Sequence, residues 1–179
     1  VGPWWVAVSS PVGGGHAPIY GWGLSIPYAL GLVFSGSLVD AVRFMLALQA
    51  LVAPVAFCVV RVIAPTRWAA AVGAGLLAAL DPGLVDTAIS GSEGYLAALW
   101  IGLMTLGVLG GASRAWSVCA GVALGFAAMN HPLALCATPL LWTKSGQGRA
   151  AWTALGVAGL LCLPQLGALL GGALEGGRS

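Results

Sequence analysis

The chain has 179 residues, of which 59% are hydrophobic and 7% are charged, and its formal net charge is +2. Soluble domains carry about 25% charged residues, so this composition predicts an integral membrane protein. The small net charge offers no basic face for nucleic acid, and nucleic-acid binding is excluded as a function.

The amino-terminal segment, residues 1–40, is expected to lie outside the membrane or at its surface. Residues 1–10 have no cationic stretch followed by an apolar core, so they do not resemble a cleaved signal. Residues 19–39 are apolar but contain several glycines and prolines, which suits either a further span or an interfacial helix. We favour a helix that lies in the membrane surface, or partly enters it, and leads into the first clear span.

Residues 41–60 form the clearest span. A hydrocarbon core about 30 Å thick requires about 20 helical residues, and this run has that length, with Arg43 and Gln49 as its polar interruptions. Pro54 has no backbone N–H, so we expect the helix to bend there.

The segment after this span is expected to return across the membrane. The link 62–66 lies between Arg61 and Arg67 and suits a tight cytoplasmic connection, because cytoplasmic loops are enriched in Lys and Arg. The apolar run 68–80 then meets Asp81-Pro82, so it either continues to Ile89 or stops within the outer half of the bilayer.

Four more apolar runs follow. Residues 94–111 are near spanning length, 115–129 and 132–142 form a shorter pair hinged at Asn130-His131-Pro132, and 151–170 is the last long run. Short, broken segments are tolerated in a membrane only where protein or a water-filled cavity covers their backbone. We therefore expect Asn130 and His131 to face an interior recess.

These runs predict an all-α, polytopic transmembrane bundle of about six to seven apolar helices, some short or broken. The helical core covers 41–171, and the Gly-rich residues 172–179 form a flexible tail. Glycines four apart at 107/111 and 121/125 allow close approach of helix backbones. We interpret them as packing within the chain, with a weak indication of a dimer interface.

The charges separate by sign when the runs are placed as spans. One side of the membrane receives every acid: Asp40, Asp81, Asp86, Glu93 and Glu175. The opposite side receives five of the seven cations: Arg61, Arg67, Arg114, Lys144 and Arg149. Four tryptophans, at positions 68, 116, 142 and 152, lie within three residues of a cation on that side, as an interfacial belt requires. We expect a multi-pass protein of a plasma or inner membrane with its acidic loops on the outer face.

Three carboxylates in the loop between two apolar runs, Asp81, Asp86 and Glu93, are the first candidates for chemistry. Such groups can act as a general base, bind the hydroxyls of a sugar or hold a divalent metal. The alternative is structural, because Asp81 before a proline suits a turn and Glu93 can stabilise a helix amino terminus.

Arg43 and the two histidines are candidates for binding. Arg43 could hold a phosphate headgroup or simply pair with Asp40, three residues before it. His16 and His131 have no zinc-ligand spacing, so a ligand or proton-shuttle role stands beside a structural one. The four cysteines (Cys58, Cys119, Cys136, Cys162) lie inside apolar runs without a CxxC pair and suit small buried hydrophobes.

Three segments resemble GT-C-type membrane glycosyltransferases, which include protein O-mannosyltransferases and the aminoarabinose transferases of lipid A. These are His16-Ala-Pro-Ile-Tyr20 followed by Asp40-Ala-Val-Arg43, then Leu77-Ala-Ala-Leu-Asp-Pro82 with Ser90-Gly-Ser-Glu93, and Gly125-Phe-Ala-Ala-Met-Asn-His-Pro132. The resemblance covers residues 15–170 and lies in pattern and loose motifs.

The resemblance implies transfer of a sugar from a polyprenyl-phosphate carrier to a lipid or protein acceptor on the outer face. By this resemblance, Glu93 and Asp86 correspond to the acids of the family's second outer loop. Arg43 corresponds to a cation that binds phosphate. His16 and Tyr20 correspond to the residues at which the family's first outer loop ends. By the same resemblance, His131 and Asp81 are also expected near the substrate.

The family's first span and the acid in the loop after it have no counterpart, since Asp40 is the first acid. Either the chain is a fragment or divergent product that is inactive alone, or the resemblance describes ancestry. The alternative is a non-catalytic membrane scaffold or subunit. A transporter is disfavoured, because the centres of the spans carry no ionisable group.

Overall fold

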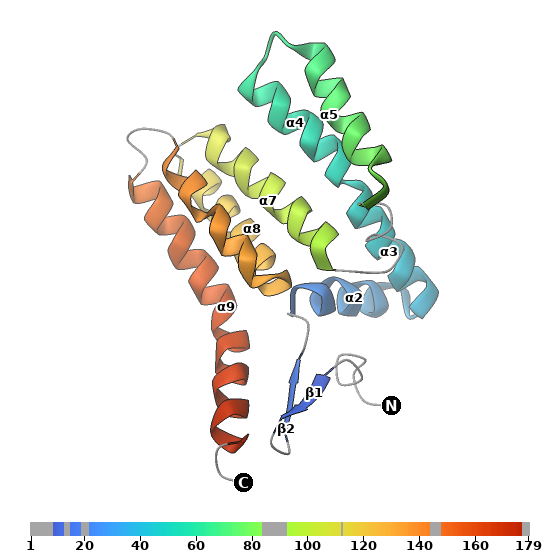
Figure 1. The fold of residues 1–179 in the computed structure, drawn as a ribbon, viewed down its shortest axis with the longest axis vertical. Coiled ribbons are helices and arrows are strands. Elements are labelled where there is room, and N and C mark those ends of the chain that lie inside the picture. The colour runs from blue at the N-terminus through green and yellow to red at the C-terminus, as the bar shows by residue number, and fades with distance from the viewer. Residues whose placement is uncertain are drawn as a thin grey trace.

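A computed structural model describes residues 9–12, 15–18, 22–83, 93–111, 113–143 and 148–176. Most of these residues are helical, as predicted, and the helices pack side by side (Figure 1). They follow a two-stranded antiparallel ribbon of β1 (Ser9–Val12) and β2 (Gly15–Pro18), in which Val12 pairs with Gly15. The ribbon is not among the elements expected from the sequence, because it depends on pairing rather than on apolar length.

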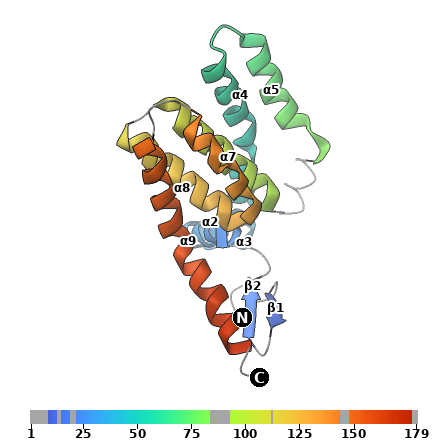
Figure 2. The same cartoon turned by 60° about the vertical axis from the view of Figure 1, so that its left-hand side comes forward.

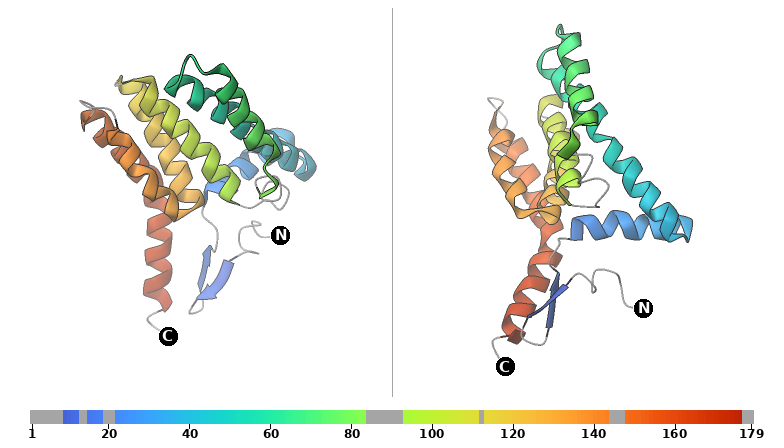
Figure 3. Two further views of the ribbon diagram at one scale, coloured as in Figure 1. Left: turned by 45° about the horizontal axis from the view of Figure 1, so that its top comes forward. Right: turned by 45° about the vertical axis from the view of Figure 1, so that its right-hand side comes forward.

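Helix α2 (Trp22–Ser35) runs across one end of the bundle, at a steep angle to the helices that follow (Figure 3). Its backbone approaches α3 (Leu38–Ala50) closely, since a Cβ added at Gly31 would lie 3.0 Å from the Cα of Ala41. The reversal between the two helices passes through Gly36, whose φ of +68° lies in the region that glycine adopts without steric cost.

Helices α3 and α4 (Val52–Ile63) form one long apolar rod that is interrupted at Leu51. Proline clashes with the carbonyl four residues earlier and cannot donate to it. For Pro54, the carbonyl four residues earlier belongs to Ala50. The helix is interrupted at the next residue, Leu51, whose N–H donates to Leu48 O at 3.2 Å. The helical assignment is thus interrupted one turn before Pro54, while Leu38–Ile63 remains one apolar stretch of 26 residues.

The next helices alternate in direction. Helix α5 (Trp68–Leu80) returns along α4, and α7 (Glu93–Gly110) is followed by α8 (Arg114–Asn130). Helix α5 ends at Leu80, before Asp81-Pro82, and residues 84–89 of the predicted continuation lie outside the described residues.

The apolar run after the predicted hinge is a 3₁₀ helix, η1 (Pro132–Trp142). The chain breaks at His131, where φ is −146° and ψ is 121°, so the predicted hinge is confirmed. Pro132 starts η1 and Pro139 lies inside it. Since Pro139 cannot donate a backbone hydrogen bond, it disfavours a regular α-helix over this run.

Helix α9 (Gly148–Gly176) is the longest element, with 29 residues. Its second half extends past the bundle and contacts the ribbon (Figure 2). Residues 172–176, assigned from the sequence to a flexible tail, are helical here. That assignment is corrected: Ala173, Leu174 and Glu175 are good helix formers, and the helix continues through them.

Helix α7 lies at the centre of two hydrophobic clusters. The first joins it to α8, η1 and α9 through buried residues that include Met104, Leu124 and Leu141. The second joins it to α3 and α4 through Met45, Val52, Leu96 and Leu99. Trp100 and Leu103 of α7 pack against both clusters, so this helix ties the two parts of the bundle together.

The predicted glycine pairs pack within the chain. A Cβ at Gly107 would lie 3.0 Å from the Cβ of Ala120 on α8, and one at Gly125 would lie 3.0 Å from Leu161 on α9. A Cβ at Gly121 would meet the carbonyl oxygen of Ala154 at 2.5 Å. Gly107, Gly121 and Gly125 thus let helix backbones approach within the chain, as predicted. Gly111 follows the end of α7 with a φ of +137°, and a Cβ there would lie 3.9 Å from the Trp116 ring.

Among the described residues, two helical stretches are long and apolar enough to cross a membrane: Leu38–Ile63 with 26 residues and Gly148–Gly167 with 20. Only 11% and 17% of their apolar windows are buried. The core helix of a soluble protein would be mostly buried, whereas these helices expose large hydrophobic side chains such as Ile63, Leu51 and Leu160. Shorter apolar helices accompany them, including Trp68–Leu80 and Leu96–Gly110.

Candidate functional site

Several helix termini lie toward the end of the bundle crossed by α2 (Figure 3). Helix α3 begins at one end of α2, whereas α7 begins and the break between α8 and η1 lies near its other end. Helix α5 packs along α4 and ends beside the junction of α3 and α4. The residues at these termini are Asp40, Asp81, Glu93 and His131. We call this the acidic end.

The opposite end carries the links between α4 and α5, between α7 and α8, and between η1 and α9. Four cations belong to the helix termini there: Arg61, Arg67, Arg114 and Arg149. The predicted separation of acids from most cations is therefore present at these helix ends, and we call this the cationic end.

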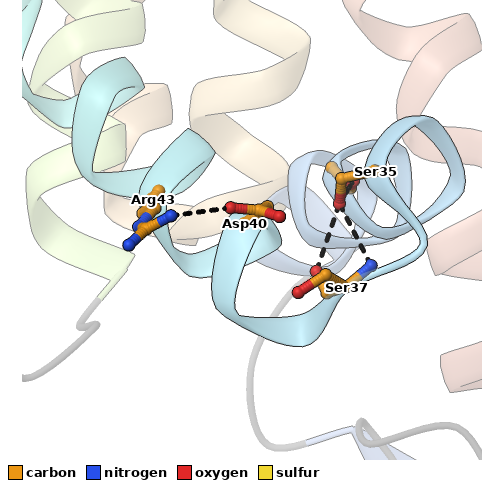
Figure 4. Close-up of polar contacts among 5 residues, drawn as sticks. Ser35, Ser37, Asp40 and Arg43 are labelled. Carbon is orange, nitrogen blue, oxygen red and sulfur yellow. Dashed lines mark hydrogen bonds and ion pairs between the residues drawn. The ribbon is translucent and has the colours of Figure 1, made fainter.

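Arg43 and Asp40 face each other on the first turns of α3 (Figure 4). The Nη1 of Arg43 donates to Oδ1 of Asp40 at 3.0 Å, and the two side chains are 74% and 46% exposed. An exposed pair of this kind contributes at most about 1 kcal/mol to stability. The pairing that the sequence offered as the simpler role of Arg43 thus exists, and the exposed guanidinium keeps further N–H donors.

The turn before this pair is held by serine hydroxyls (Figure 4). The Oγ of Ser35 donates to Gly31 O at 2.7 Å and accepts from the backbone N–H of Ser37 at 3.3 Å. These bonds fix the reversal from α2 into α3, so α2 and the Arg43 pair are positioned by the same few residues.

The hinge presents one buried and one half-buried polar side chain. Asn130 is 1% exposed and its Nδ2 donates to Phe126 O at 2.8 Å, while its Oδ1 is buried without a protein partner. The Nδ1 of His131 accepts from the Leu133 N–H at 3.3 Å and caps η1. This bond gives His131 a structural role and directs its proton to Nε2 when the ring is neutral. Asn130 is interior, as predicted.

Asp81 follows the last residue of α5. Its φ of −62° and ψ of 116° are extended, as a residue before proline prefers, and its N–H donates to Leu77 O at 2.9 Å. The helix therefore stops where Pro82 requires, in agreement with the structural interpretation of Asp81. Its carboxylate stands at the acidic end and is exposed.

Four predicted site residues are placed only partly or not at all. Asp86 and Tyr20 lie outside the described residues. Glu93 is the first residue of α7, and His16 pairs with Pro11 in the ribbon. Their backbone positions put Glu93 at the acidic end and His16 in the ribbon beside α9.

Two further polar groups were missed as candidates. Gln49 is 2% exposed and packs with the buried stripe of α3, and its Oε1 has no protein partner. Trp100 stacks on Phe126 with ring centroids 4.8 Å apart, and its Nε1 is also buried without a partner. In the sequence, Gln49 is a single amide within an apolar span. Whether its side chain faces the interior depends on how α3 packs against α7.

A cavity of about 10 Å³ lies between α7, α8, η1 and α9, where Ser117 lines it beside small residues such as Gly107 and Ala151. This volume suits one water molecule. Within the described residues, no three His, Cys, Asp or Glu side chains gather as metal ligands. No protein-family model, curated protein or solved structure matches the chain.

Proposed function

We propose that the chain is a multi-pass membrane protein whose acidic end faces the outer side. The exposed apolar surfaces of Leu38–Ile63 and Gly148–Gly167 support this, because lipid is the environment that such surfaces require. The opposite charge of the two bundle ends supports the orientation, since Lys and Arg favour the cytoplasmic side.

We further propose that it forms the core of a GT-C-like glycosyltransferase, which moves a sugar from a polyprenyl-phosphate carrier to a lipid or protein acceptor. The observation that carries this proposal is the acidic end itself. The starts of α3 and α7, the end of α5 and the hinge all lie toward the end of the bundle that α2 crosses, away from the links that carry the cations. Carboxylates and a guanidinium are the groups that sugar transfer from a phosphate needs.

In this proposal each group has a distinct role. Glu93, with Asp86, accepts a proton from the attacking hydroxyl of the acceptor. Arg43 binds the carrier phosphate, which receives negative charge as the bond between the sugar and the phosphate breaks.

We expect Arg43→Gln to weaken binding of undecaprenyl phosphate to the purified protein by about tenfold, because a hydrogen bond to a charged group contributes about 1.5–3 kcal/mol. Microscale thermophoresis in detergent measures this affinity. The matched control is Asp40→Asn, which removes the partner of Arg43 and leaves its charge, so binding should be unchanged or tighter. If both variants lost the same thermal stability and neither changed binding, Arg43 would serve only the ion pair.

Glu93→Gln tests the chemistry separately. In protein charged with polyprenyl-phosphate sugars, the loss of a general base should slow transfer by about 10²–10⁴. Radiolabelled sugar recovered in lipid or protein acceptors gives the rate. Absence of transfer to every acceptor, with no difference between Glu93→Gln and the parent protein, would end the enzyme proposal.

A non-catalytic scaffold is the second candidate. Its specific support is α9, where Gly148, Gly156, Gly159 and Gly167 all have open space beside them. At 100° per residue these positions share one face of the helix. Such a face admits close approach by a helix of another protein.

A further inference from the structure

The cationic end combines exposed indole rings with exposed guanidinium groups. Four tryptophans stand there, with exposed fractions between 45% and 69%: Trp68, Trp116, Trp142 and Trp152. They belong to four different helices, α5, α8, η1 and α9, so the aromatic groups are distributed over several elements at this end. The acids of the described part belong to the other ends of their helices.

Two of these groups are arranged by direct contact. The guanidinium of Arg61 stacks over the ring of Trp68 at 5.0 Å, and its Nη1 contacts Pro65 O. Trp68 in turn meets Phe57 edge to face at 5.2 Å. On the other side of the bundle, Trp142 and Trp152 meet edge to face at 6.1 Å, with Arg149 one turn before Trp152 on α9. The first contact orders an indole against a cation, and the second orders two indoles near the start of α9.

Helix stability explains Arg61, which lies in the last turn of α4, but not the other three cations. Arg67 occupies the N-cap position of α5 without a capping hydrogen bond, Arg114 is the first residue of α8 and Arg149 is the second residue of α9. The helix dipole disfavours positive charge at an amino terminus. An anion outside the protein can reverse that cost, because it is attracted by the guanidinium and by the terminal N–H groups together.

We infer that the cationic end binds the phosphate groups of an anionic phospholipid leaflet, with the four indoles at the level where hydrocarbon meets headgroup. Charge complementarity selects anionic over zwitterionic lipid. Indole rings favour that interface because one edge is polar and the body is apolar. The inference depends on insertion in a membrane but not on sugar transfer.

The test uses the full chain in vesicles of phosphatidylcholine that contain spin-labelled lipid. Electron paramagnetic resonance gives the association of labelled phosphatidylglycerol relative to labelled phosphatidylcholine. We expect the parent protein to prefer phosphatidylglycerol at least threefold at low salt, since each cation near an anionic surface contributes up to about fivefold. The preference should fall when salt is raised to 1 M, where screening is short-ranged.

The decisive variant is Arg61→Gln/Arg114→Gln/Arg149→Gln, which should lose most of this preference. The matched control, with Lys at the same three positions, keeps the charge and should retain it. An unchanged preference in the Gln variant, or no preference in the parent protein, would overturn the inference. Flotation of the chain with vesicles tests insertion independently, and an inactive enzyme would still show the lipid preference.

Discussion

Leu51→Arg should raise the free energy of membrane insertion of the 38–63 segment by about 2.5–3.5 kcal/mol, the cost of arginine at the centre of a spanning helix. Leu51 lies at the junction of α3 and α4, near the middle of the 26-residue apolar stretch, and is 48% exposed. On a soluble protein the same exposed substitution would change stability by no more than about 0.5 kcal/mol. A glycosylation-based insertion assay in microsomes measures the difference.

Ile63→Arg is the matched control for that experiment. Ile63 is the last residue of α4 and is 63% exposed, so the side-chain change is comparable while the position is terminal. A long cationic side chain near a helix end reaches the interface, and the cost should be much smaller. Equal and negligible costs at both positions would contradict membrane insertion of this helix.

Gly121→Ala should lower the stability of the folded bundle by about 1–3 kcal/mol through overpacking. The added Cβ would lie 2.5 Å from the carbonyl oxygen of Ala154 and 2.8 Å from the Cβ of Val157. Neither neighbour can rotate away, because one is backbone and the other is the branch point of a side chain. Helices α8 and α9 would have to separate, and thermal unfolding in detergent should report a lower midpoint.

Gly156→Ala, on the partner helix α9, provides the comparison. Nothing lies within 4 Å of a Cβ at this position. Alanine is favoured over glycine inside a helix by about 0.8–1.0 kcal/mol, so this variant should be as stable as the parent or more so. If Gly121→Ala unfolded at the same temperature as Gly156→Ala, the close contact between α8 and α9 would be absent.

Much of the helical layout could be predicted because its signals are local. The break at residues 130–132 and the effect of Pro54 follow from backbone chemistry that acts within one or two turns. The separation of acids from most cations could also be predicted from the sequence. When successive helices alternate in direction, every second link between them lies at the same end of the bundle.

Other features depend on contacts between distant segments. The ribbon of β1 and β2, the continuation of α9 beside it and the burial of Gln49 each require knowledge of a neighbour that the local pattern does not contain. The role of Arg43 stayed open for a different reason. The hydrogen bond that pairs it with Asp40 uses the same guanidinium that a phosphate would use, so sequence spacing fits both.

The 3₁₀ geometry of η1 has a consequence for the lipid around it. Eleven residues at about 2.0 Å each give about 22 Å, roughly 8 Å less than a typical hydrocarbon thickness. A bilayer adapts to so short an element by thinning beside it. In the membrane arrangement proposed above, this thinning would bring headgroups and water closer to the hinge at His131.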